Sequence, residues 1–113
     1  AGRDGLQEIV IGMTHRGRIN VLTNIIGKPP SEIYDEFQDR GRRHGVMTSG
    51  DVKYHQGFSS SVETPGGITH VVLGFNPSHL EIIDPVIEGA VRARQQRRGD
   101  RSGDEVLPIL IHG

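Results

Sequence analysis

Two polar turns in the sequence combine side chains that can bind an anionic ligand. Residues 14–17 read Thr-His-Arg-Gly after one apolar run, and residues 76–79 read Asn-Pro-Ser-His after another. The guanidinium of Arg16 forms a planar fork that suits a diphosphate or a carboxylate. In α/β proteins, ligands bind beyond the carboxyl ends of the strands, where helix N-termini and free backbone N–H groups converge. The two turns therefore predict one site that presents His, Arg and Ser together.

A structural role for the first turn is the alternative. Arg16 would then pair with a nearby carboxylate, and His15 would bind a backbone carbonyl. The residue types alone leave both interpretations open.

Other kinds of catalytic site find little support. The six histidines show neither an i,i+4 helical pair nor the His-Glu-x-x-His spacing of zinc hydrolases, so we predict no metal ligand within the chain. The sequence contains no Gly-x-Ser-x-Gly elbow, P-loop or Gly-x-Gly-x-x-Gly motif. Ser78 is better explained as a helix cap than as a nucleophile, because residues 78–81 fit a capping box.

Four short segments predict the strands that would carry these turns. Residues 8–13 contain three consecutive β-branched side chains and are expected to be buried on both faces. Residues 58–64 and 68–74 flank Pro-Gly-Gly and predict a hairpin. Residues 106–111 predict a last strand, in which Pro108 counts against a fully paired position.

Helical spacing follows the first turn. We expect one helical face to carry Ile19, Leu22, Ile25 and Ile26, with Gly27 and the prolines after it as the stop. Ser31 is expected to cap a second, short helix in which Ile33 and Phe37 form an apolar pair. Residues 40–45 end it with basic side chains, and residues 46–57 predict a long functional loop.

A third helix is expected after residue 84. The single turn capped by Ser78 should break at Pro85, and Asp84 should recap a longer helix with Pro85 at its first position. Its inward side chains are expected to be Val86, Ile87, Ala90 and Val91. Arginines near its end would complement the helix dipole, and residues 99–105 are expected to form a polar, mobile loop.

Composition bounds the size and class of the protein. The 113 residues, with 16 Gly, 6 Pro and only 34% hydrophobic side chains, indicate a loop-rich fragment of one domain that relies on neighbouring structure. A net charge of −1 gives no overall field for nucleic acid or an anionic membrane. No apolar run is long enough to predict a membrane span.

Three longer motifs carry a family resemblance. They are residues 12–20 (Gly-Met-Thr-His-Arg-Gly-Arg-Ile-Asn), 50–60 (Gly-Asp-Val-Lys-Tyr-His-Gln-Gly-Phe-Ser-Ser) and 75–81 (Phe-Asn-Pro-Ser-His-Leu-Glu). In order and spacing they resemble the thiamine-diphosphate-dependent decarboxylating component of the 2-oxoglutarate dehydrogenase complex, from about Gly5 to Gly113. The chain departs from the family at Thr14 and Ile19, where Ala and Leu are usual.

The resemblance implies a fold and an activity. The fold is α/β: residues 1–113 would be a partial thiamine-diphosphate-binding domain, truncated at both ends, with a mainly parallel sheet flanked by helices plus a β-hairpin. The activity is oxidative decarboxylation of 2-oxoglutarate in the tricarboxylic acid cycle. The succinyl group would pass to the lipoyl group of a partner acyltransferase, and the fragment alone would be inactive.

The same resemblance implies roles for individual residues. His15 and His55 would be catalytic and bind the 2-oxo acid, and Ser59 and Ser78 would assist in substrate binding. A dicarboxylate substrate beside a diphosphate needs such hydrogen-bond donors.

Cofactor contacts follow in the same way. Arg16 would bind the diphosphate of thiamine diphosphate, and the turn containing Ser78 and Leu80 would lie against the cofactor, which supplies the electron sink for decarboxylation. The ligands of the Mg²⁺ ion would lie beyond Gly113.

The implied partners are dihydrolipoyl succinyltransferase and dihydrolipoyl dehydrogenase, with a homodimer in the full-length enzyme and neither nucleic acid nor membrane. The expected location is the bacterial cytoplasm or the mitochondrial matrix. A 2-oxoadipate dehydrogenase homologue stays open, because one methylene changes specificity by only about 1–3 kcal/mol. An alternative of another class is a nucleic-acid-binding or interaction module that uses the Arg-rich segments 40–43 and 92–101, although interleaved aromatics are missing there.

Overall fold

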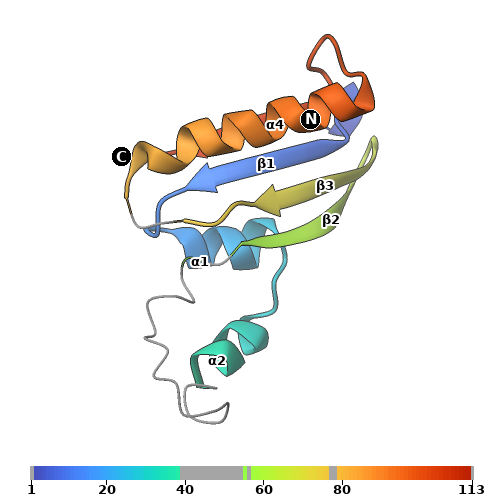
Figure 1. Ribbon diagram of the computed structural model, residues 1–113. Helices are drawn as coiled ribbons and strands as arrows, with labels where there is room; N and C mark the ends of the chain where they lie inside the picture. The colour runs from blue at the N-terminus through green and yellow to red at the C-terminus, as the bar shows by residue number, and fades with distance from the viewer. Residues whose placement is uncertain (1, 39–54, 56, 77–78, 113) are drawn as a thin grey trace.

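The computed structural model describes residues 2–38, 55, 57–76 and 79–112. Its strands are β1 (Glu8–Met13), β2 (Phe58–Thr64), β3 (Gly67–Leu73) and β4 (Val106–Ile111), in the sheet order β2-β3-β1-β4 (Figure 1). Strands β3 and β4 run parallel to β1, and β2 pairs antiparallel with β3. The expected α/β class, the mainly parallel sheet and the hairpin are thus confirmed.

Helices lie on both faces of this sheet. The chain forms η1 (Gly2–Asp4), α1 (Arg18–Asn20), the π-helix η2 (Val21–Ile25) and α2 (Pro30–Gln38), and later the 3₁₀ turn η4 (Glu81–Ile83) and α4 (Asp84–Arg98). In Figure 1, α4 lies along one face, whereas α1 lies on the other. Among the described residues, no helix has the length and apolar character needed to cross a membrane.

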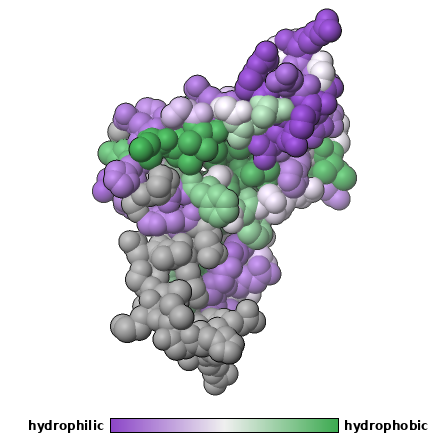
Figure 2. All heavy atoms as spheres, in the orientation of Figure 1, coloured by the Kyte–Doolittle hydropathy of each residue, from purple (hydrophilic) through white to green (hydrophobic). Residues whose placement is uncertain are grey.

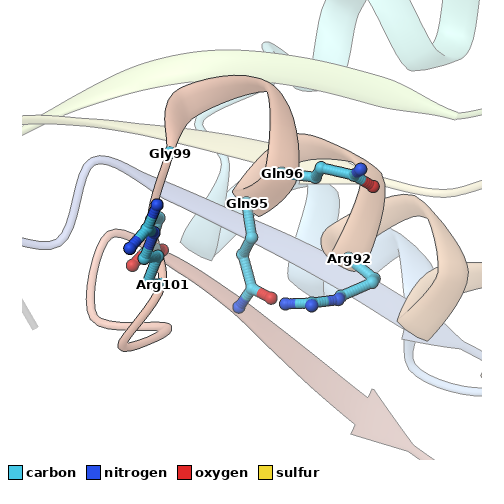
Figure 3. Close-up of a pocket in the computed structure, with 6 residues that line it drawn as sticks. Arg92, Gln95, Gln96, Gly99 and Arg101 are labelled. Carbon is cyan, nitrogen blue, oxygen red and sulfur yellow. The ribbon is translucent and has the colours of Figure 1, made fainter.

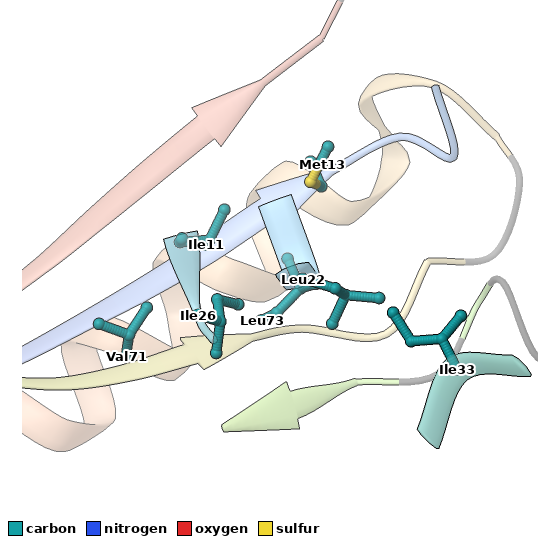
Figure 4. Close-up of a cluster of buried hydrophobic side chains, with 7 residues drawn as sticks. All are labelled: Ile11, Met13, Leu22, Ile26, Ile33, Val71 and Leu73. Carbon is teal, nitrogen blue, oxygen red and sulfur yellow. The ribbon is translucent and has the colours of Figure 1, made fainter. Parts of the chain in front are cut away.

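Strand β1 is buried on both faces, as its β-branched run predicts. Ile11 and Met13 contribute to one core cluster, whereas Val10 contributes to the other. The first cluster, shown in Figure 4, consists of Ile11, Met13, Leu22, Ile26, Ile33, Val71 and Leu73. The second consists of Val10, Ile83, Ile87, Val91 and Val106. Because both faces are covered, the carboxyl end of β1 is held between two packed layers.

Two glycines let α4 approach the sheet closely. A Cβ atom at Gly12 would lie 2.7 Å from Cγ1 of Ile87, and one at Gly74 would lie 2.5 Å from its Cδ1. A side chain at Gly12 would force Ile87 to shift, and one at Gly74 would meet the end of its side chain, so Ile87 packs directly over the backbone near the ends of β1 and β3.

An ion pair joins the other end of α4 to β1. The buried carboxylate of Glu8 accepts from Nε of Arg94 at 2.7 Å and from Nη2 of Arg98 at 3.1 Å. These two arginines were expected to serve the helix dipole, and the structure shows that they also bind the sheet. This contact fixes the carboxyl end of α4 on the sheet, and the packing of Ile87 fixes α4 near its start.

We expect Glu8→Gln to loosen this contact by about 2 kcal/mol, less than for a fully buried pair because both arginines are partly exposed. Hydrogen exchange of the β1 amides in the intact protein should then be about 30-fold faster. Glu63→Gln, an exposed carboxylate on β2, is the control. Unchanged β1 exchange would show that the ion pair contributes little.

The loop after α4 is ordered, contrary to the expectation that residues 99–105 would be mobile. Asp100 is buried and accepts backbone N–H groups of Gly103, Asp104, Glu105 and Val106 at 2.8–3.2 Å. Burial raises the pKa of the Asp100 carboxyl, but the four N–H donors outweigh it and hold that pKa below its usual value. Polar composition predicted a flexible loop because it does not reveal where a carboxylate points.

Because folding lowers the pKa of Asp100, its ionised carboxylate stabilises this loop fully at pH values above the ordinary pKa of an aspartate. This stabilisation is lost as the pH falls through the lowered pKa. We expect Asp100→Asn to speed exchange at residues 103–106 about tenfold at neutral pH. The difference between wild type and variant should vanish in acid. A difference that does not depend on pH would exclude ionisation as the cause.

Two details of the first two helices differ from expectation, and one agrees with it. Ile19 and Ile25 are exposed, because the change from α to π geometry after Asn20 breaks the 3.6-residue period. Gly27 does end this helix, with φ of 81°. The second helix begins at Pro30, not after a Ser31 cap: the N–H groups of residues 32 and 33 donate to Pro29. Proline suits the first helical position because it has no N–H to satisfy.

The start of α4 also differs. The turn η4 continues into the helix without a break, and Asp84 is not its cap: the residue before α4, Ile83, is helical and makes no side-chain cap bond. The inward face is formed by Ile83, Ile87 and Val91, whereas Val86 is exposed. Figure 2 shows apolar side chains gathered over the amino-terminal half of α4 and polar ones over the rest.

Candidate functional site

Polar residues from several strands meet at one edge of the sheet. By edge we mean a side formed by strand ends, here the carboxyl ends of the parallel strands, and not an outer strand. The parallel strands β1, β3 and β4 end there, followed by Thr14, Gly74 and His112, and the antiparallel β2 begins there after Gly57. The N–H of Asn76 donates to the carbonyl of His55 at 2.9 Å, which joins the segment before β2 to the one after β3. The expected convergence of the strand ends is therefore present.

A cleft of about 450 Å³ opens at this edge. Its lining residues are Thr14, His15, Arg16, Leu80, Ile111 and His112. Three of them, His15, Arg16 and Leu80, are residues that the sequence assigned to the site. They come from the turns after β1 and before η4, and so from parts of the chain more than sixty residues apart.

The backbone of the first turn explains why its side chains face solvent. Gly17 has φ of 77°, a left-handed conformation that favours glycine, and the N–H of Arg18 donates to the carbonyl of His15 at 3.2 Å. The chain reverses within this turn. His15 and Arg16 are consequently exposed at its tip, where a ligand can reach both.

Arg18, immediately behind the turn, is almost fully buried, at 1% exposure. Its guanidinium donates to the carbonyls of Met13, at 3.4 Å, and of Gly74, and so ties the ends of β1 and β3 together. Burial lowers the pKa of Arg18 to about 10. Sequence reasoning missed this residue, because arginine at an inward position is rare. The signal was its position four residues before Leu22 and eight before Ile26, on the same helical face.

The other predicted residues lie elsewhere. His55 is half-buried beside Asn76, and Ser59 is exposed on β2, opposite Val72 in the register. Neither lines the cleft, since β2 is at the far side of the sheet from β4. Ser78, with its predicted cap, lies outside the described residues, as do residues 40–54.

His112 completes the cleft and was not assigned to the site from sequence. Its ring lies between two carboxylates, with Nε2 3.5 Å from Oδ2 of Asp84 and Nδ1 3.6 Å from Oε1 of Glu81. The signal was its position as the first polar residue after an apolar strand, the same position that Thr14 occupies. Within the described ranges, no group of three or more His, Cys, Asp or Glu could hold a metal ion.

A second hollow lies at the opposite edge, near the carboxyl end of α4 (Figure 3). It measures about 550 Å³ and is lined by Arg92, Gln95, Gln96, Gly99, Asp100 and Arg101. Although it is the larger of the two, it contains none of the predicted site residues and lies at the amino ends of the parallel strands. The smaller cleft is therefore the candidate site.

Comparison with known proteins finds similar sequences over the whole chain. The chain is 58% identical to the 2-oxoglutarate dehydrogenase E1 component of Azotobacter vinelandii and 57% identical to that of Cupriavidus necator, in each case over all 113 residues. Identity to the E1 component of Haemophilus influenzae is 48% over the same length. The chain matches a segment of the 2-oxoglutarate dehydrogenase E1 component.

The match to the E1 component extends beyond the three motifs to the whole chain, which confirms the resemblance found in them. The chain spans 12% of the length of each of these E1 components. No family model matches the chain.

Proposed function

We propose that the chain forms part of the active site of a thiamine-diphosphate-dependent enzyme that oxidatively decarboxylates 2-oxoglutarate. The observation that carries this proposal is the cleft, which gathers His15, Arg16 and Leu80 at the carboxyl edge of a mainly parallel sheet. The full-length similarity to E1 components supports it. Residues 1–113 would then be part of the cofactor-binding domain.

The polar lining of the cleft suits an anionic cofactor. The guanidinium of Arg16 would hold the diphosphate of thiamine diphosphate through charge-assisted hydrogen bonds, with Thr14 beside it. Leu80 offers an apolar contact to a ring, and Ser78, which lies outside the described residues, is a further proposed cofactor contact. When bound, the cofactor would supply the electron sink for loss of carbon dioxide.

Recognition of the substrate is assigned to histidines. His15 would donate a hydrogen bond to the 2-oxo acid within the cleft, and His55 would contribute from the segment before β2, assisted by Ser59. Such donors bind developing or fixed negative charge without an added proton transfer. We assign no step to Mg²⁺, because the described residues offer no set of ligands that fits it.

The product and partners follow from this activity. The succinyl group would pass to a lipoyl group on a dihydrolipoyl succinyltransferase, and dihydrolipoyl dehydrogenase would complete the complex around a homodimeric E1 component. The cytoplasm or the mitochondrial matrix would be its location. No observation on the described residues favours 2-oxoadipate, and the similarity to E1 components disfavours a nucleic-acid-binding role.

The proposal is tested with the intact enzyme that carries this chain. Thiamine diphosphate should bind in a calorimetric titration, and 2-oxoglutarate should then release carbon dioxide faster than 2-oxoadipate or pyruvate. Decarboxylation that proceeds equally without the added cofactor, in enzyme freed of it by dialysis, would contradict the proposal.

A further inference from the structure

We infer that His112 binds an anionic oxygen of the ligand in the cleft and that Asp84 orients its ring for this purpose. This inference rests on the proposed function. It adds a binding residue that none of the three sequence motifs contains.

The sheet register places His112 beside the first turn. Gly12 is aligned with Leu110 and Met13 with Ile111, so the next residues along the two parallel strands are Thr14 and His112. Both line the cleft, together with Arg16. The end of β4 therefore contributes a hydrogen-bonding ring to the same space as the guanidinium.

The two carboxylates that contact the His112 ring differ in how exposed they are, and so in how firmly they can hold it. The side chain of Asp84 is 18% exposed and lies in the first turn of α4, whereas that of Glu81 is 63% exposed. Oδ1 of Asp84 is buried and has no hydrogen-bond partner within the described part of the chain, so this carboxylate has spare capacity to hold a donor. Asp84 is thus the fixed partner and Glu81 the exchangeable one.

The separations of 3.5 and 3.6 Å are longer than ordinary hydrogen bonds. An exposed contact of this length contributes little, so a ligand oxygen can replace Glu81 at Nδ1 at small cost. The ring, with a proton on each nitrogen, would then donate Nδ1–H to the ligand and Nε2–H to Asp84. Asp84 thereby fixes the orientation in which Nδ1 faces the ligand.

An anion fits this position better than a cation. Arg16 and His112 on neighbouring strand ends both offer N–H donors, and in the described part of the chain the carboxylates of Asp84 and Glu81 contact His112 but do not line the cleft. The oxygen to be bound belongs either to the diphosphate of the cofactor or to a carboxylate of the 2-oxo acid.

The experiment measures both ligands in the intact enzyme. We expect His112→Gln to weaken one of them at least about tenfold: the calorimetric Kd for thiamine diphosphate, or the KM for 2-oxoglutarate at saturating cofactor. A change in the Kd would identify the oxygen as one of the cofactor diphosphate, and a change in the KM would identify it as one of the 2-oxo acid. His70→Gln, a histidine on the hairpin that contacts Ser61 outside the cleft, is the matched control and should leave both constants unchanged.

Glu81→Gln provides an independent arm. Removing the competing charge should tighten the same ligand about twofold or more, and this gain should be absent when His112 is also replaced by Gln. The inference is overturned if folded His112→Gln leaves both constants within twofold of wild type, or if Glu81→Gln weakens binding. If wild-type enzyme binds the cofactor and turns over while these variants show no effect, only this inference fails and the proposed function stands.

Discussion

Replacing Arg16 with Ala is expected to weaken binding of thiamine diphosphate by roughly ten- to a hundred-fold. Arg16 lines the cleft at the tip of an exposed turn, where its guanidinium can donate two hydrogen bonds to a diphosphate. A total loss of about 1.5–3 kcal/mol, the contribution of one hydrogen bond to a charged group, corresponds to that range, because water replaces part of the contact at an exposed turn. These bonds act in the ground state and the transition state alike. At saturating cofactor, kcat should therefore fall much less than cofactor affinity.

Calorimetric titration of the intact enzyme with thiamine diphosphate measures the change. Arg92→Ala is a matched control, because Arg92 is exposed and lines the hollow at the opposite edge of the sheet. The control should bind the cofactor like wild type. Equal affinity of Arg16→Ala and wild type would return Arg16 to the structural role considered from the sequence.

His55→Ala is expected to lower kcat/KM for 2-oxoglutarate by roughly ten- to a hundred-fold. His55 lies at the same edge of the sheet, where its backbone carbonyl accepts from Asn76. If its side chain donates to a substrate carboxylate, its removal leaves that anion poorly paired, a loss of about 1.5–3 kcal/mol.

A 2-oxo monocarboxylate separates the two ends of the substrate. It lacks the distal carboxylate, so its turnover should fall less in His55→Ala if His55 recognises that group. An equal fall for both substrates would place His55 at the shared 2-oxo acid end. His70→Ala is the control, and normal kinetics of His55→Ala with both substrates would show that His55 is structural.

The strands were predictable because their signals are local. The consecutive β-branched residues of β1 predict a strand buried on both faces, and the Pro-Gly-Gly turn predicts the hairpin, both of which the structure confirms. The gathering of His15, Arg16 and Leu80 was predictable too, because parallel strands place their carboxyl ends at one edge.

The features that sequence reasoning missed depend on tertiary contacts. Arg18 is buried because two strand ends offer carbonyls to it, and Val86 is exposed because the continuous turn η4 sets the rotation of α4. His112 joins the cleft only through the pairing of β4 with β1. Helical period and residue type contain no information about such partners.

The close packing of Ile87 over Gly12 and Gly74 has a consequence for how tightly a ligand can be bound. The helix that carries Asp84 is located in part by the buried side chain of Ile87, which packs against backbone atoms that have few alternative positions. Asp84, which contacts the His112 ring in the cleft, is therefore held in place before any ligand arrives. Less conformational entropy remains to be lost on binding, so more of the energy of each polar contact contributes to affinity.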